Sequence, residues 1–244
     1  VADWHARWWA ARIAGRKTLE RNEQVWRIYV APTWGPWPLE AVTRMEVQGW
    51  AVKLLADLVE RERLAAAKSQ REPRTVGIRT VEQSVGLLSM LMQAALDEDP
   101  PVLAGRNPCR GVVAALPESP QRPPTYFTVE QVDALLVQLA EPYRTLVDFA
   151  SYSGLRWGEL GGLGARHLDF LHGLVHVRAV LEDDGSLREH PKSKRSRRAV
   201  PIPPHLIERV RELAAVAGPG PVFRRPDGER LDYDMFRTVW DHAV

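Results

Sequence analysis

The segment YSGLRWGELGGL, residues 152–163, places an arginine in the middle of an apolar stretch. Apolar side chains recur at helical spacing before it, and Gly154 is expected to end that helix. An unpaired buried charge is costly, so Arg156 must meet an anion, solvent or a ligand. Glu159 lies three residues on, which leaves a purely structural ion pair open as one interpretation.

The composition is that of an ordinary globular protein. The chain has 244 residues, 45% of them hydrophobic and 26% charged, which is enough for one large domain or two small ones. A single cysteine, Cys109, rules out an internal disulfide framework and fits a reducing cytoplasm. No run of about 18 apolar residues predicts a membrane span, and the first residues do not resemble a secretory signal. The sequence does not begin with Met, so an earlier segment is possible.

The first half of the chain has helical patterns only. Thr43 and Glu46 form a predicted capping box. Seven of the nine tryptophans lie in the first 50 residues, where core packing is the plain explanation. The expected helices cover residues 1–14, 17–30 (ending before Pro32), 43–62 and 80–98.

A proline-rich segment separates this half from the second. It is the best linker candidate, centred on residues 115–125. Thr128 and Gln131 then predict a second capping box. Further helices are expected at 129–139, 142–153 and 204–217, with another beginning near Tyr233. Alternation predicts a strand over 173–182, followed by two short strands around the basic turn in 187–203.

Net charge is only +2, but the positive residues are clustered. Residues 61–79 hold six Lys or Arg and two Glu, and PKSKRSRR, residues 191–198, holds five and no acid. Such clusters are typical of proteins that bind polyanions. For any single cluster, a charged face that simply contacts solvent explains the pattern equally well.

Three features together resemble the tyrosine recombinase (phage integrase) family. SYSGLRWGEL is similar to its first Arg box, and PKSKRSRRAVPIPPHL is similar to its lysine hairpin and following strand. The segment from TVEQSVGLLSM to RNPCRGV is similar to the last helix of its core-binding domain and the exit from it. The resemblance spans nearly the whole chain. It implies a mainly α fold with a small antiparallel β-sheet: a helical core-binding domain (1–114), a linker (115–125) and part of the α+β catalytic domain (126–244).

The family resemblance implies DNA cleavage by a tyrosine, through a 3′-phosphotyrosyl intermediate. Preorganised cations stabilise the extra negative charge on the phosphate, and the planar fork of arginine binds two phosphate oxygens at once. Arg156 is therefore the expected phosphate clamp, with Glu159 orienting it. Lys192, with Lys194 as the rival, is expected to protonate the leaving 5′-oxygen, unless it makes a plain phosphate contact.

The family's His-x-x-Arg box and nucleophilic tyrosine have no match here. None of the five tyrosines stands in the corresponding place, and DMFRTVWDHAV resembles the stretch before that box. We therefore expect a recombinase fragment that binds DNA without cutting it. Whether the natural chain continues past Val244 separates an active recombinase from a non-catalytic DNA-binding protein on the same fold.

The implied partner is double-stranded DNA held in a clamp by the two domains, by a bacterial or phage-encoded protein that forms a homo-tetramer on DNA at full length. No cofactor is implied. His167, His172 and His176 with Asp169 match no metal template, and a helical protein-interaction module is the remaining alternative. The candidate phosphate contacts are Arg16, Lys17, Arg21, Arg74, Arg79, Lys194, Arg195, Arg197 and Arg198.

Overall fold

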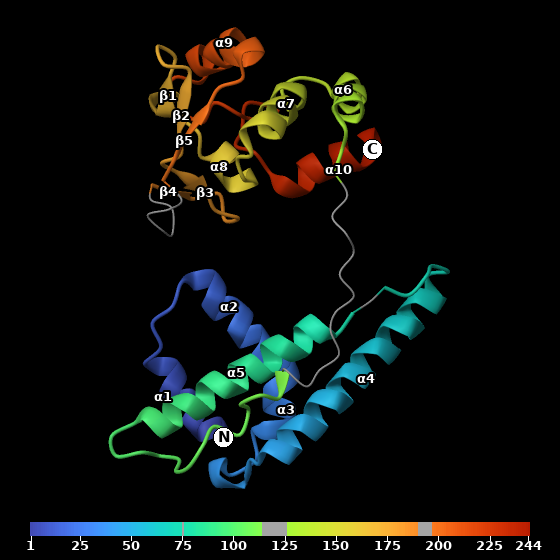
Figure 1. Ribbon diagram of the computed structural model, residues 1–244, viewed down its shortest axis with the longest axis vertical. Helices are drawn as coiled ribbons and strands as arrows, with labels where there is room; N and C mark the ends of the chain where they lie inside the picture. Colours follow the sequence, from blue (N-terminus) through green and yellow to red (C-terminus); the bar gives the residue numbers. More distant parts are fainter. Residues whose placement is uncertain (75, 114–125, 190–196) are drawn as a thin grey trace. The chain divides into compact units, whose positions relative to one another are not determined.

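The computed structural model describes residues 1–74, 76–113, 126–189 and 197–244 (Figure 1). The chain divides into two compact units, Val1–Pro123 and Pro124–Val244, and each is described by itself. The predicted linker at 115–125 lies outside the described residues. The prediction of a mainly α fold with a small antiparallel sheet is confirmed.

Every regular element in the described part of the first unit is a helix. The helix α5 packs against α1, α2 and α4, because one of its faces is apolar along its whole length. Each fully buried Leu or Val on that face contributes about 1.5–3 kcal/mol. The elements, in chain order, are α1 (Ala2–Ala10), α2 (Arg16–Val25), η1 (Trp26–Val30), α3 (Ala31–Trp34), η2 (Leu39–Ala41), α4 (Arg44–Lys68) and α5 (Ile78–Asp97).

Tryptophans fill much of this core. Trp34 is fully buried and meets the rings of Trp37 and Trp50 edge-on, at centroid distances of 5.1 and 5.6 Å. The indole of Trp4 is buried and donates a hydrogen bond to the carbonyl of Leu91 in α5 (2.9 Å). These contacts tie α1, α3 and α4 to the core.

Two predicted helix ends in this unit are wrong. The second helix does not end before Pro32, because a π-helical turn over Trp26–Val30 leads directly into α3. Pro32 then stands in the first turn of α3, where a missing N–H costs little. The third helix continues six residues beyond residue 62, to Lys68, because no Gly or Pro interrupts it before Ser69.

The second unit begins with helices whose ends follow local signals. The Thr128–Gln131 capping box is present, with both of its hydrogen bonds. Gly154 ends α7 in the left-handed conformation (φ 61°). The elements are α6 (Val129–Gln138), α7 (Tyr143–Ser153), α8 (Trp157–Gly161), η4 (Ala165–His167), η6 (Pro204–Leu206), α9 (Ile207–Ala217) and α10 (Tyr233–Ala243).

The strands of this unit are short and antiparallel. A three-stranded sheet has the order β1-β2-β5, from β1 (Leu168–Asp169), β2 (Leu174–His176) and β5 (Ala199–Pro201). Val175 faces Val200 in its register and is fully buried. A separate hairpin pairs β3 (Val180–Leu181) with β4 (Leu187–Arg188).

The single strand predicted over 173–182 is therefore wrong. It is divided into β2 and β3, which belong to different sheets, because β3 leaves β2 to pack against α8. The core of the unit gathers around Phe149 of α7 and Phe223, whose rings lie 5.3 Å apart. None of the helices in the described part of the chain has the length and apolar character that crossing a membrane requires.

Candidate nucleic-acid interface

Arg156 stands at a sharp corner between two helices of the second unit. Leu155 turns into the core, and Arg156 then adopts an extended conformation as the residue that precedes α8. Its side chain is 76% exposed, so the guanidinium reaches solvent although the surrounding sequence is apolar. The corner thus presents a guanidinium on a rigid support.

The carboxylate of Glu159 lies beneath Arg156 and is almost completely buried, with 4% of its side chain exposed. Its Oε2 accepts hydrogen bonds from the Arg156 backbone N–H (2.9 Å) and from Nη2 of Arg198 (2.8 Å). Its Oε1 accepts from Nη1 of Arg156 (3.2 Å) and from Nη1 of Arg198 (3.0 Å). We call Arg156, Glu159 and Arg198 the Glu159 cluster.

The charge of Glu159 is held in place by these donors. Burial alone raises the pKa of a carboxyl group, but the hydrogen bonds from Arg198 and from the Arg156 backbone outweigh it, so the pKa of Glu159 lies below its ordinary value. The same hydrogen bonds raise the pKa of the Arg198 guanidinium. Glu159 is therefore an anion at neutral pH, and it orients arginines rather than transferring protons.

The sequence predicts Arg198 as one of several surface contacts to phosphate. In the structure its side chain is paired with Glu159 instead. Arg198 directly precedes β5 and makes a two-pronged ion pair with Glu159, 39 residues earlier in the chain. Sequence reasoning missed this partnership, because nothing local in RSRR distinguishes Arg198 from its exposed neighbour Arg197. A DNA contact from Arg198 stays a prediction.

Two glycines allow α8 to bring Glu159 close to the strands. A Cβ atom on Gly158 would lie 2.8 Å from the carbonyl oxygen of Leu181, and one on Gly162 would lie 2.7 Å from the backbone of Ala179. Any side chain there would push α8 away from β3. The glycines of WGELGG were the available sequence signal for this close approach.

The segment with the candidate lysines, which is predicted to form a hairpin, lies mostly outside the described residues. Lys192, Lys194 and Arg195 lie outside the described residues, and Arg197 is exposed at their C-terminal border. The choice between Lys192 and Lys194 as the catalytic lysine stays open.

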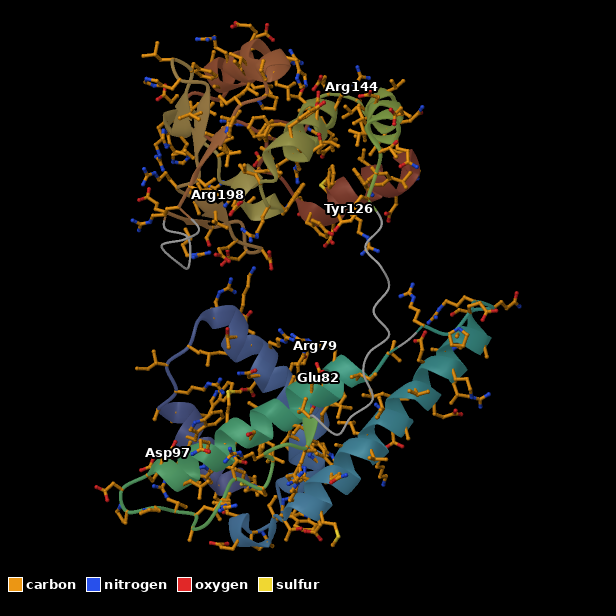
Figure 2. All side chains as sticks on the ribbon, viewed as in Figure 1. Arg79, Glu82, Asp97, Tyr126, Arg144 and Arg198 are labelled. Carbon is orange, nitrogen blue, oxygen red and sulfur yellow. The ribbon has the colours of Figure 1, made fainter. Side chains whose placement is uncertain are left out.

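The candidate contacts of the first unit lie at its surface, and two of them have a carboxylate partner within one helical turn. Arg16 pairs with Glu20 (2.9 Å), and Arg79 pairs with Glu82 (3.3 Å) near the start of α5 (Figure 2). Such exposed pairs contribute about 0–1 kcal/mol, so a phosphate can replace the carboxylate. The remaining candidates are Arg21, whose Nε lies 3.3 Å from Gln83, Arg74, whose backbone N–H bonds Glu62, and Lys17 on α2. Each stays a prediction.

The three histidines considered as metal ligands, His167, His172 and His176, do not come together in one site. His172 Nδ1 lies 2.7 Å from the carboxylate of Asp169, as a local pair. His167 instead bonds the backbone N–H of Gly164 through Nδ1. Within the described ranges, no three His, Cys, Asp or Glu side chains gather in a way that could hold a metal ion.

The tyrosines differ in their surroundings. Tyr143 is buried in the core, and burial raises the pKa of its hydroxyl. Tyr126, Tyr152 and Tyr233 are exposed. Tyr233 packs edge-on against Trp157, the residue after Arg156, with ring centroids 5.5 Å apart. It is thus the tyrosine that the ring contacts bring next to the Arg156 corner.

Comparison with known proteins gives matches in sequence and in structure. No family model matches the chain. The putative prophage phiRv2 integrase of Mycobacterium tuberculosis, in strains H37Rv and CDC 1551, is 33% identical over 154 residues, which is 61% of this chain. The match covers 39% of that integrase, so the chain corresponds to about two fifths of the length of these curated relatives.

Solved integrase structures share the fold over nearly the whole chain. The Tn1549 transposon integrase in complex with transposon right end DNA has a TM-score of 0.73 at 18% identity, over 98% of this chain and 76% of that one. A lambda integrase dimer bound to a core site has a TM-score of 0.64 at 15% identity, over 100% of this chain and 62% of that one. The chain therefore has the fold of the tyrosine recombinase integrases, and three fifths of it is similar in sequence to a prophage integrase.

Proposed function

We propose that this chain binds duplex DNA and supplies the first phosphate clamp of a site-specific recombinase, which cuts and rejoins DNA through a 3′-phosphotyrosyl intermediate. The Glu159 cluster carries the proposal. An exposed guanidinium held at its base by a buried carboxylate is preorganised for an anion, because the arginine is already oriented before the anion arrives.

The cluster divides the work between its two arginines. Both Nη groups of Arg198 donate hydrogen bonds to Glu159. Only Nη1 of Arg156 does so, and the rest of its guanidinium is exposed to solvent. Arg156 therefore takes two phosphate oxygens, while Arg198 supports the carboxylate from below. Lys192, or Lys194, protonates the leaving 5′-oxygen.

DNA as the partner is supported by the structural relatives. The Tn1549 integrase and the lambda integrase dimer that share this fold are both bound to DNA. A lambda integrase tetramer on a Holliday junction, with a TM-score of 0.62 at 14% identity over 99% of this chain and 64% of that one, supports a tetramer of the whole protein on DNA. In this proposal, residues 1–114 are the core-binding domain and residues 126–244 are part of the catalytic domain.

The 244-residue polypeptide by itself is proposed to bind DNA without cutting it. None of its tyrosines matches the place of the family's nucleophile, and loss of a covalent nucleophile removes most of the rate of a coupled catalytic set. The alternative function is a non-catalytic DNA-binding protein that occupies recombination sites, and a cleavage assay on the natural full-length product separates the two.

Binding is tested by fluorescence anisotropy with a labelled duplex, titrated with salt from about 50 to 200 mM. We expect a steep loss of affinity with salt, and Arg156→Gln should reduce the slope of log K against log salt by about 1. Arg209→Gln is the matched control, because Arg209 is neutralised by Glu212 (2.9 Å) and Glu141 (3.7 Å). Binding that does not change with salt would overturn the proposal.

Cleavage is tested with a suicide DNA substrate that traps a covalent complex. The 244-residue chain should form none, and the natural full-length gene product should form one. If the natural product binds but forms no covalent complex, the non-catalytic alternative is correct. A covalent complex with the short chain would contradict the binding-only proposal, and loss of that complex in Tyr233→Phe but not in Tyr126→Phe would name the nucleophile.

A further inference from the structure

A second positive cluster lies beside a separate pocket of the same unit. The pocket has a volume of about 380 Å³ and is lined by Arg166, His167, Arg178, Ala179, Glu189 and Arg197. It contains none of the three residues of the Glu159 cluster. We call the three arginines and His167 the His167 cluster.

The strand register explains why two neighbouring arginines serve different clusters. His176 of β2 pairs with Ala199 of β5, and the N–H of Val177 donates to the carbonyl of Arg198 (2.9 Å). Continuing this antiparallel register places Arg178 opposite Arg197. Successive side chains of a strand point to opposite faces, so Arg197 points away from the face on which Arg198 meets Glu159.

His167 is a buried neighbour of the pocket arginines. It is 6% exposed, and its Nδ1 accepts a hydrogen bond from the backbone N–H of Gly164 (3.1 Å). Its Nε2 accepts from Nε of Arg166 (3.2 Å). A neutral imidazole has one acceptor nitrogen, so it cannot accept from both donors at once. An anionic oxygen in the pocket would relieve this competition by accepting from Arg166.

The charges of the cluster are only partly compensated. Arg166 has an ion pair with Glu189 (3.3 Å), and both side chains are largely exposed. Arg178 and Arg197 are exposed and have no carboxylate partner within the part of the chain that the structure describes. Burial, followed by the charges of Arg166 and Arg178, lowers the pKa of His167, so the surroundings disfavour a further cation there.

We propose that Arg166, Arg178 and Arg197, which line the pocket beside the buried His167, bind a phosphate of the DNA backbone, as a second phosphate site separate from Arg156. This inference rests on the proposed function, because it assumes that duplex DNA is the partner. A phosphodiester fits the donors, since its two non-bridging oxygens are strong acceptors that share one negative charge.

The test measures the salt slope of DNA binding for the 244-residue chain and its variants. Arg178→Gln and Arg197→Gln should each lower the slope by about 1, and the double variant by about 2. The charge-preserving double variant Arg178→Lys and Arg197→Lys should keep a slope close to that of the unchanged protein. Arg209→Gln again serves as the control, and circular dichroism checks that each variant is folded.

The outcomes separate the two proposals. If the unchanged protein shows no salt-dependent binding to duplex DNA, the proposed function and this site both fail. If it binds with a steep slope and the double Gln variant has the same slope, only the second phosphate site is overturned. A uniform reduction in slope that the Lys variants restore supports the site.

The phosphate itself is identified with uncharged methylphosphonate linkages placed one at a time along the duplex. A linkage that weakens the unchanged protein but leaves the double Gln variant unaffected marks the phosphate that this pocket binds. If every linkage weakens both proteins equally, the pocket does not contact the DNA backbone and the second phosphate site is overturned.

Discussion

The Glu159 cluster and the His167 cluster use the same kinds of side chains in opposite ways. In the first, a buried carboxylate takes four hydrogen bonds from two arginines. In the second, three arginines and a buried imidazole line a pocket with one exposed carboxylate. In the first cluster Arg198 is paired within the fold and only Arg156 keeps donors for an anion, whereas in the second all three arginines keep donors for a ligand. Charge balance therefore separates an arginine that supports the structure from one that is available to bind.

The largest effect is expected on removing the central anion. Glu159→Ala leaves Arg198 without its partner, and we expect a cost of about 3 kcal/mol, at the lower end of the range for a buried pair, because the Arg198 side chain is 31% exposed. Urea unfolding followed by fluorescence should show this loss in the free energy of unfolding of the second unit. Glu212→Gln, in an exposed pair with Arg209, is the control and should change stability by less than about 0.5 kcal/mol. If Glu159→Ala and Glu212→Gln had the same free energy of unfolding, Glu159 would not stabilise the fold, and the two clusters would no longer differ in this respect.

A smaller effect is expected from moving α8 without changing any charge. Gly162→Ala places a methyl group against the backbone of Ala179, and overpacking of this kind costs about 1–3 kcal/mol. It should also weaken DNA binding through Arg156, since the corner shifts with the helix. Gly86→Ala in α5 has open space around it and should be neutral or stabilising. Full binding by Gly162→Ala would show that the Arg156 corner does not depend on this close approach.

The two clusters should lose stability in different ranges of acid pH. The folded pKa of His167 is lowered, so its contribution is complete above the unfolded value of about 6.5 and is lost as pH falls toward the folded value. The folded pKa of Glu159 is lowered too, so its contribution is lost only below about 4.3.

His167→Asn keeps an acceptor for Gly164 but does not titrate. The difference in unfolding free energy between this variant and the unchanged protein should vary with pH just below 6.5 and be constant above it. His5, whose pKa burial and Arg12 lower to about 4, titrates in the same range but is common to both proteins. A pH-independent difference would mean that His167 has an ordinary pKa.

The smallest effect on stability is expected at the pocket. Arg178→Gln removes an exposed cation without a carboxylate partner in the described ranges, so the free energy of unfolding should change by less than about 0.5 kcal/mol. The measurement is the same urea titration. A loss above about 1 kcal/mol would make Arg178 a structural residue and weaken the case for a ligand.

Local signals in the sequence predicted much of the fold. The N-cap hydrogen bond at Thr43, the capping box at Thr128 and the left-handed Gly154 act within one helical turn, so their effect could be predicted without knowing the rest of the chain. The second bond of the box predicted at Thr43 and Glu46 does not form, because Glu46 accepts from the Thr43 hydroxyl instead. One exception is Pro32, where a π-helical turn allows the helical path to continue. No local pattern indicated that turn.

The site was only half predictable, because its partners are far apart in the sequence. Arg156 and Glu159 are three residues apart, and their pairing follows from helix geometry. Arg198 contacts Glu159 across 39 residues, and Arg178 stands opposite Arg197 only because of the β2–β5 register. Strand β3 also leaves the sheet between Val177 and Val180, which alternation of apolar and polar residues does not reveal.

The β2–β5 register has a further consequence for how this protein tolerates change. Because side chains alternate with a period of two, a slip of β5 by a single position would turn Arg197 toward Glu159 and Arg198 toward the His167 pocket. The two sites would then exchange arginines with no substitution at all. An insertion or deletion directly before Ala199 is therefore a sharper perturbation of both sites than most point mutations, and a two-residue change is milder than a one-residue change.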